Sequence, residues 1–284
     1  MTDGTLVLTS FAASAVLGGR WFVVLFPLAG LVYAHRARTT YNELLREVVL
    51  VVAAYFAYFL VRGATEGSLG TATTHAYDIV RLERDLGLFQ ERRLQELITG
   101  RQWMVDVANW VYIWGHWPVI ALVATWLFLA RRRTYYLFRN AFVISGAIGL
   151  FAFALYPLAP PRLIADLGIV DTVTLHSHSY RVLQPPALVN QYAAMPSLHF
   201  GWNLLIGIAL VGEAERWPAR ALGLVLVPLM WMSVVLTGNH FIIDTVAGAG
   251  LALFGLGVSW LYSNRFSSHD MRGETAAEIR SLDR

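Results

Sequence analysis

Cysteine and lysine are both absent from this chain of 284 residues, and only 14% of its residues are charged. Without cysteine there can be no disulfide, no thiolate nucleophile and no thiolate metal site. Soluble domains have roughly 25% charged residues, whereas 56% of the residues here are hydrophobic. This composition argues against a soluble enzyme and is typical of a chain embedded in a lipid bilayer.

A continuous basic stripe is missing as well. The net charge of +3 and the pI near 9.3 could suggest nucleic-acid binding. The arginines instead form clusters between apolar stretches, whereas a nucleic-acid backbone is bound by a basic stripe or patch. We therefore expect no nucleic-acid partner and attribute the clusters to membrane topology.

Long uncharged runs organise the chain. Five of them can cross a hydrocarbon core about 30 Å thick, which takes about 20 residues at ~1.5 Å per residue. They are 107–130, 140–161, 182–212, 221–243 and 245–264. Two shorter apolar segments, 21–34 with a lead-in from Leu6 and 48–61, count as further spans. The sequence predicts an all-α, polytopic membrane bundle of six or seven spans with short interfacial helices.

Clusters of arginine predict how the chain crosses the cell membrane. If the crossings alternate, three basic joints and the C-terminal tail fall on one side, which the positive-inside rule makes cytoplasmic. The joints are 36–46, 131–139 and 216–220. The loops 62–102 and 158–195 and a tight turn near Gly238 then lie on the extracytoplasmic side, although six arginines in 62–102 weaken the rule there.

Four segments follow from this pattern: N-terminal transmembrane segments (1–62), an extracytoplasmic interfacial segment (63–102), a transmembrane core (103–264) and a disordered cytoplasmic tail (265–284). Apolar residues in 63–102 recur every three or four positions, which predicts two amphipathic helices separated at Gly87. They are Ile79, Leu82, Leu86, Leu94, Leu97 and Ile98. These helices fit the lipid interface, and a solvated helical hairpin is the alternative.

The polar segment Ala-Met-Pro-Ser-Leu-His, residues 194–199, opens one span. Pro196 suits the first turn of a helix, where unpaired amides would face the loop. Such amides bind anions, most often phosphate. A simple helix start with a capping hydroxyl would explain Pro196 and Ser197, but it would not explain His199 beside them.

A second polar motif, Gly-Asn-His-Phe-Ile-Ile-Asp, covers residues 238–244. His240 and Asp244 are four residues apart, so they share one helix face. A carboxylate on one ring nitrogen makes the other a better base or nucleophile, and ionisable groups at span ends are mostly functional. A structural hydrogen bond between helices is the alternative.

The spacing brings the two motifs together. His199 and His240 are 41 residues apart, and a hairpin of two spans takes about 40 residues to cross the membrane and return. Both histidines therefore end at the same face. Arg162 in the loop 158–195 is on this face too. It either holds phosphate oxygens as a fork donor or serves as an interfacial anchor.

These motifs resemble those of the type 2 phosphatidic acid phosphatase superfamily of membrane enzymes. Pro196-Ser197-Leu198-His199 looks like its second signature, Pro-Ser-Gly-His, and His240 with Asp244 looks like the end of its third. Leu198, the Ala-Pro-Pro at 159–161 and the Gly-Asn-His-Phe block resemble its inositol phosphorylceramide synthase (inositolphosphotransferase) branch. The resemblance covers about residues 100 to 262.

The resemblance implies metal-independent phosphoryl or phosphodiester transfer through a phosphohistidine, with no cofactor. By this resemblance, His240 attacks phosphorus, Asp244 orients its ring, and His199 protonates the leaving oxygen and then activates water or an alcohol. Arg162, Ser197 and backbone amides would bind the phosphate oxygens.

Two cations of the family pattern are missing, because Leu155 and Val234 stand where the signatures have lysine and arginine. Other polar residues would have to compensate: Arg181, Asn239, or one of His176 and His178. A less cationic site suits a singly charged phosphodiester better than a doubly charged monoester.

Three further histidines carry other expectations. His176 and His178 could be a metal pair, but no third ligand follows at suitable spacing, so a loop or substrate contact is expected. His116 lies within a span, where we expect an interhelical hydrogen bond, with Asn109 or Tyr112 as candidate partners.

Three functions fit the sequence. The first is a lipid phosphotransferase or phosphatase at the extracytoplasmic face, with a lipid phosphate as substrate and an alcohol as acceptor. The second is a polyprenyl or phosphatidate phosphatase with water as sole acceptor. The third is a transporter or membrane scaffold, and transport would require broken or polar helices near mid-membrane. No oligomeric state follows from the sequence.

Overall fold

The structure is a computed structural model that describes residues 41–64, 67–176 and 190–282. It is built from helices, and the described residues form no β-strand. The predicted first span, which begins at Leu6, lies outside these residues. The prediction of an all-α, polytopic membrane protein is confirmed for the described residues.

Four helices are long and apolar enough to cross a membrane: α2 (Tyr41–Ala64), α7 (Arg132–Leu155), α11 (Trp217–Leu236) and the first part of α12 (Ile242–Leu282). The pair α5 (Gln102–Trp114) and α6 (Trp117–Ala130) counts as a fifth span if it is taken together. Between α7 and α11 lies α10 (Leu198–Glu213), which is apolar but shorter. The helical backbone of α12 extends to Leu282, into the range for which the sequence predicts a disordered tail.

The span predicted as 107–130 is interrupted in the structure. Helices α5 and α6 meet at an angle of 44° around Gly115 and His116. Pro118 lies in the first turn of α6, where its missing amide and its ring are tolerated, whereas inside a continuous helix it would break the hydrogen-bond ladder. The bend places His116 at a junction between helices.

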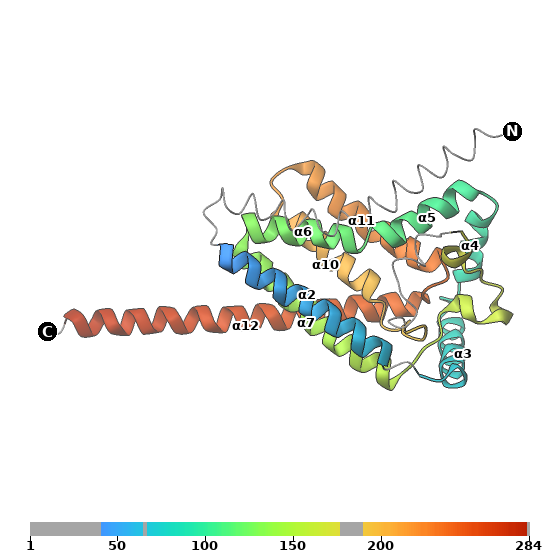
Figure 1. Cartoon of the computed structure of the whole chain (residues 1–284), viewed down its shortest axis with the longest axis horizontal. Coiled ribbons are helices and arrows are strands. Elements are labelled where there is room, and N and C mark those ends of the chain that lie inside the picture. Colours follow the sequence, from blue (N-terminus) through green and yellow to red (C-terminus); the bar gives the residue numbers. More distant parts are fainter. Residues whose placement is uncertain (1–40, 65–66, 177–189, 283–284) are drawn as a thin grey trace.

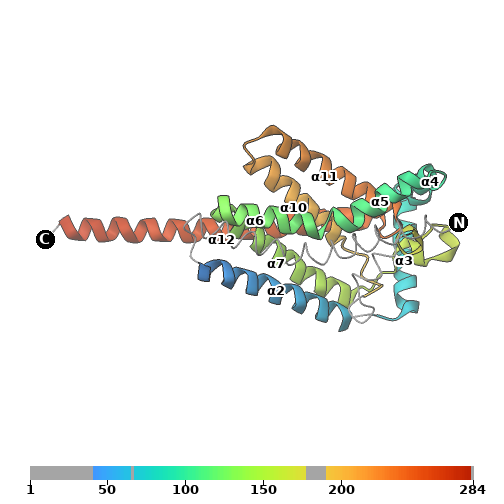
Figure 2. The same cartoon turned by 45° about the horizontal axis from the view of Figure 1, so that its top comes forward.

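Helix α10 lies at the centre of the bundle, packed against α11 and α12, while α7 packs against α12 and α2 lies along α7 (Figures 1 and 2). The approach of α10 to α12 depends on small residues. A Cβ atom on Gly201 would lie 2.4 Å from the carbonyl oxygen of Gly248, and a Cβ atom on Gly248 would lie 2.2 Å from that of Ser197. Glycine at both positions lets the two helices that begin at the polar motifs touch.

Ion pairs identify one end of the bundle. Arg131, at the joint of α6 and α7, contacts Glu213, the last residue of α10, and Glu215 in the turn that follows it. Arg132 pairs with Glu43 at the start of α2 at 2.6 Å. The basic joints 131–139 and 216–220 therefore lie at the same end, as alternating crossings predict.

The opposite end is covered by α3 (Leu69–Asp85), α4 (Glu91–Thr99), the short turns η1 (Pro161–Leu163) and η2 (Ala165–Leu167), and α8 (Thr172–His176) (Figure 1). Gly87, with φ of 70°, separates α3 from α4 as predicted. The predicted apolar stripe is divided, however. Ile79 and Ile98 are buried against the protein, and Leu82, Leu86 and Leu97 are exposed. Their placement in the lipid interface stays a prediction.

Candidate active site

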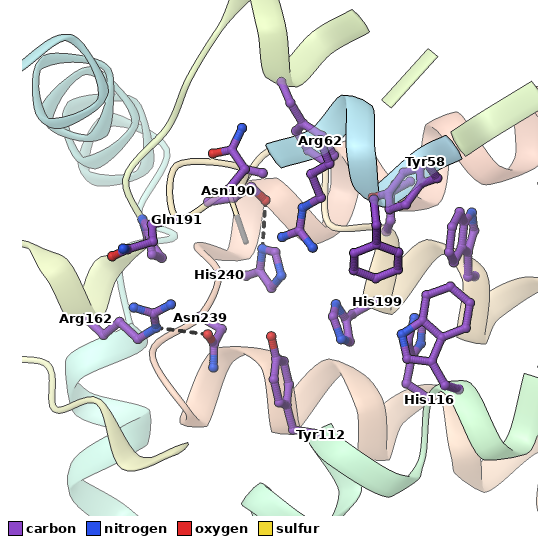
Figure 3. A pocket seen from close by; sticks show the side chains of 18 residues that line it. Tyr58, Arg62, Tyr112, His116, Arg162, Asn190, Gln191, His199, Asn239 and His240 are labelled. Carbon is purple, nitrogen blue, oxygen red and sulfur yellow. Dashed lines mark hydrogen bonds between the residues drawn. The ribbon is translucent and has the colours of Figure 1, made fainter. Parts of the chain in front are cut away.

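A cavity lies where the second half of α2, the bend between α5 and α6, the start of α10 and the loop before α12 converge (Figure 3). Its polar and aromatic lining comes from distant parts of the chain. The residues labelled in Figure 3 are Tyr58, Arg62, Tyr112, His116, Arg162, Asn190, Gln191, His199, Asn239 and His240. Four of the predicted site residues are among them: Arg162, His199, Asn239 and His240.

The loop between α11 and α12 positions His240 through a tight turn. Gly238 has φ of 70°, a left-handed conformation that favours glycine. A Cβ atom there would lie 2.9 Å from Ile169 and 3.1 Å from the Cβ atom of Arg162. The Gly238 carbonyl accepts a hydrogen bond from the Arg162 amide at 3.0 Å. The turn therefore fixes Arg162 and His240 relative to one another.

The ring of His240 is oriented mainly by a backbone carbonyl. Its Nδ1 donates to the Ala194 carbonyl oxygen at 2.7 Å, whereas Asp244 Oδ2 is 3.6 Å from Nδ1. The sequence predicts Asp244 as the direct partner. In the structure the Asp244 carboxylate instead accepts a hydrogen bond from the Phe241 amide at 2.8 Å. A proton on Nδ1 leaves Nε2 as the free lone pair of the neutral ring.

His240 is kept neutral by its surroundings. Burial lowers the pKa of its imidazole to about 3, and the positive charges of Arg62 and Arg162 act in the same direction. The neutral ring at pH 7 is the form that can act as a nucleophile.

His199 lies in the first turn of α10, held between two other rings. The ring of Tyr112 stacks on it with centroids 4.6 Å apart and 11° between planes, and the ring of His116 stacks on it at 4.1 Å and 27°. The centroids of His199 and His240 are 6.3 Å apart. Because reacting atoms lie about 3–3.5 Å apart, one phosphorus atom fits between these two rings.

His116 makes the interhelical hydrogen bond expected of it, with a different partner. Its Nδ1 accepts from Asn203 Nδ2 at 2.8 Å, and the same amide donates to the His199 carbonyl at 2.9 Å. The proposed partner Asn109 instead donates to the Thr172 carbonyl. His116 thus connects the α5–α6 bend to α10.

Two arginines from opposite sides point into the cavity (Figure 3). Arg162 Nε donates to Asn239 Oδ1 at 2.9 Å, and its Nη1 is 3.7 Å from Asp171. Arg62 reaches from the last turn of α2 toward His240 and His199. Arg62 was missed by the sequence analysis. The available signal was its position, because the positive-inside rule disfavours an arginine at that end of a span.

The positions that depart from the family pattern do not contribute to the cavity. Leu155 is 66% exposed at the end of α7, and Val234 is fully buried within α11. Arg62 and Arg162 are therefore the cations that face the histidines among the described residues.

Ser197 has a structural role in this arrangement. It is fully buried, its hydroxyl accepts from the Phe200 amide at 3.4 Å, and its own amide donates to the Asp244 carbonyl at 2.9 Å. It is the N-cap of α10, so Pro196 precedes the helix by two residues and does not lie in its first turn. The Ser197 amide is thus not available to an anion, and Ser197 ties α10 to α12.

The remaining predicted contacts cannot be placed. Arg181 and His178 lie outside the described residues, and His176 ends α8 with its side chain outside them. Within the part of the chain that the structure describes, no three histidine, aspartate or glutamate side chains gather as metal ligands.

Comparison with known proteins identifies the family that this chain matches. A family model described as the PAP2 superfamily matches residues 77–258. Phosphoinositol dihydroceramide synthase from Bacteroides thetaiotaomicron is 28% identical over 188 residues, which are 59% of this chain and 58% of that protein. The match thus spans little more than half of the relative's length. No solved structure matches the chain. The family match includes both histidines and Arg162, whereas Arg62 lies before it.

Proposed function

Because this chain belongs to the PAP2 superfamily, we propose that it is a membrane enzyme that transfers a phosphoryl or phosphodiester group of a lipid through a phosphohistidine. The observation that carries the proposal is the pair of rings, His199 and His240, 6.3 Å apart in one cavity with two arginines. A transporter or scaffold gives no reason for a histidine with a free Nε2 opposite a second histidine.

In the first step, the lone pair of His240 Nε2 attacks phosphorus. The N–P bond forms while the bond from phosphorus to the leaving oxygen breaks, and His199, held in its protonated form by the negative charge of the bound substrate, gives that oxygen its proton. In the second step, neutral His199 removes a proton from water or an alcohol. The resulting oxygen attacks phosphorus, the N–P bond breaks and neutral His240 is restored.

Arg62 and Arg162 would stabilise the charge on the phosphate oxygens in both steps. Hydrogen-bond donors that are already in place stabilise such a charge more strongly in a water-poor site than in water. Asn239 holds the guanidinium of Arg162 at 2.9 Å. Asp244, with its carboxylate on the Phe241 amide, would favour the positively charged state that His240 approaches as the N–P bond forms. No step requires a metal ion, and we propose that the reaction is metal-independent.

A phosphodiester substrate and an alcohol acceptor are favoured over simple hydrolysis of a monoester. Two cations of the family pattern are missing, at Leu155 and Val234, and a less cationic site suits the single charge of a diester better than the double charge of a monoester. The similar protein is named as a synthase, which is consistent with transfer to an acceptor. The cavity lies at the end opposite the arginine-rich joints, and the positive-inside rule makes that end extracytoplasmic.

The test is an assay of the detergent-purified protein on labelled phosphatidylinositol and phosphatidic acid, each with and without a lipid alcohol and with and without EDTA. Labelled phosphodiester that forms only with the alcohol supports the transferase. Release of phosphate or headgroup phosphate regardless of acceptor supports a phosphatase with water as sole acceptor. Activity lost in EDTA would reject metal independence.

A matched histidine control makes the assay specific. His75 bonds to the Pro157 carbonyl and stacks on Tyr156 outside the cavity lining, so His75→Gln should remain active while His240→Gln should not. Equal activity of wild type and His240→Gln would reject the proposal.

A further inference from the structure

Two buried glutamates hold the start of α12. Glu83 near the end of α3 and Glu91 at the start of α4 are both fully buried. Glu83 Oε1 accepts from the Ile243 amide at 2.8 Å, and Glu91 Oε1 accepts from the Ile242 amide at 2.9 Å. The first amides of a helix have no partner within the helix. Here, two carboxyl groups from α3 and α4 accept hydrogen bonds from such amides at the start of α12.

Asp244 completes a row of three. Its carboxylate accepts from the Phe241 amide, so three consecutive amides, at 241, 242 and 243, each donate to a different buried carboxyl group. These amides belong to the backbone between His240 and Asp244. The row therefore fixes the segment that carries the proposed nucleophile.

The second oxygens of the two glutamates are not occupied by donors. Glu83 Oε2 and Glu91 Oε2 are buried and have no hydrogen-bond partner in the described part of the chain. The two carboxyl groups accept from the neighbouring amides of Ile242 and Ile243, so they lie side by side, and Glu91 acts on Glu83 by both a hydrogen bond and its charge. Two carboxylates at such a distance cannot both be ionised, and one proton must lie between them.

The charges around Glu83 hold that proton. Burial raises the pKa of Glu83 to about 9, and the hydrogen bond and the charge of Glu91 from α4 and the charge of Asp244 from α12 act in the same direction. The charged groups that act on it are both acidic. The pair therefore carries one proton at pH 7 and loses it in alkaline solution.

We propose that Glu83 and Glu91 are positioning residues which, by sharing one proton, clamp the backbone from His240 to Asp244 and so hold His240 Nε2 in line with the substrate phosphorus. The inference rests on the proposed function for its effect on catalysis. When the proton is lost, two buried negative charges repel each other and the clamp opens. A displacement of about 1 Å at a reacting atom can lower a rate by about 100-fold.

The variant Glu83→Gln distinguishes a positioning role of Glu83 from a role in folding alone. In Glu83→Gln, the side-chain oxygen still accepts from Ile243 and the amide donates to Glu91 without a titrating proton. We expect kcat at pH 7 within about threefold of wild type, and no loss of kcat above pH 9, where wild type declines. Glu83→Ala should lower kcat about 10- to 100-fold with little change in KM. Glu96→Gln on α4, at an exposed residue, is the matched control and should retain the wild-type pH profile.

Melting temperature against pH gives a readout without activity. In the folded protein the pKa of Glu83 lies above its ordinary value of 4.5. Protonated Glu83 therefore adds its full contribution to the free energy of unfolding below pH 4.5, and this contribution is lost as the pH rises through about 9. Wild type should lose stability across this window relative to Glu83→Gln.

The outcomes separate the two proposals. Identical pH profiles of kcat and melting in wild type and Glu83→Gln would overturn the shared proton. A changed melting profile with an unchanged kcat profile would overturn the positioning role. Equal activity of wild type and His240→Gln would reject the proposed function and the catalytic effect with it, and the melting comparison would still decide whether the glutamates share a proton.

Discussion

The two ends of the helical bundle accommodate buried acidic side chains in opposite ways. At the arginine-rich end, acids meet bases: Glu47, 7% exposed, lies 2.7 Å from Arg139, and Glu43 pairs with Arg132. At the cavity end, Glu83 and Glu91 meet each other and the amides of α12. Amides and the proposed shared proton thus replace cations beside these two glutamates, and Arg62 and Arg162 are directed to the cavity. We therefore expect the ion pairs of the first end to serve stability and the cavity end to serve the proposed chemistry.

The sharpest test of this contrast is removal of the proposed nucleophile. His240→Ala should lower turnover by at least about 10³-fold and abolish the phosphoenzyme, because no other described side chain has a free Nε2 at that position. Acid-quenched phosphoenzyme and steady-state rates measure the effect. Melting should change little, and a phosphoenzyme that persists in this variant would place the covalent step elsewhere.

The arginines of the cavity should matter next most. Arg62→Gln and Arg162→Gln should each lower kcat/KM by about 10²- to 10³-fold, as the loss of one preorganised donor does. Arg132→Gln at the other end should leave kcat/KM unchanged, since its charge meets Glu43. If the two ends responded alike, the proposed difference between them would fail. An effect at Arg162 without one at Arg62 would restrict phosphate binding to the family's own motif.

Asp244→Asn should have a smaller effect, because the amide oxygen can still accept from Phe241 while the negative charge near His240 is lost. We expect kcat to fall about 10- to 100-fold with the fold retained. Rates and circular dichroism of the same preparation decide the point. A variant that unfolds would show that Asp244 acts mainly as part of the α12 start.

The sequence predicted the site as far as membrane geometry allows. A bilayer fixes the length of a hairpin, so 41 residues between His199 and His240 brought both rings to one face, and the ring contact confirms it. Arg162 followed from the same reasoning. These inferences worked because each depends on length along the chain and needs no side-chain packing.

Contacts between distant segments could not be read in this way. Arg62 reaches the cavity only because α2 lies along α7, and apolar periodicity does not say which helices pack together. Ala194 holds His240 through a backbone carbonyl, which any residue type could supply. The exposed Leu82 and Leu97 show the same limit, because a stripe of leucines does not distinguish protein from lipid as the covering phase.

The smallest expected effects concern the ion pairs of the arginine-rich end, where burial should grade the loss of stability. The Glu47 carboxylate accepts hydrogen bonds from both Arg139 and Tyr135. We expect Glu47→Gln to lower the free energy of unfolding by about 1–3 kcal/mol, because it removes the charged partner of Arg139. Glu43→Gln breaks a more exposed pair, which is worth about 0–1 kcal/mol. Denaturation in mixed micelles measures both, and kcat should stay within about twofold in each variant. Helix α2 carries Glu47 near one end and Arg62 at the other. A large loss of activity in Glu47→Gln would mean that the two ends of the bundle are coupled through this helix. The division between a stabilising end and a chemical end would then be wrong.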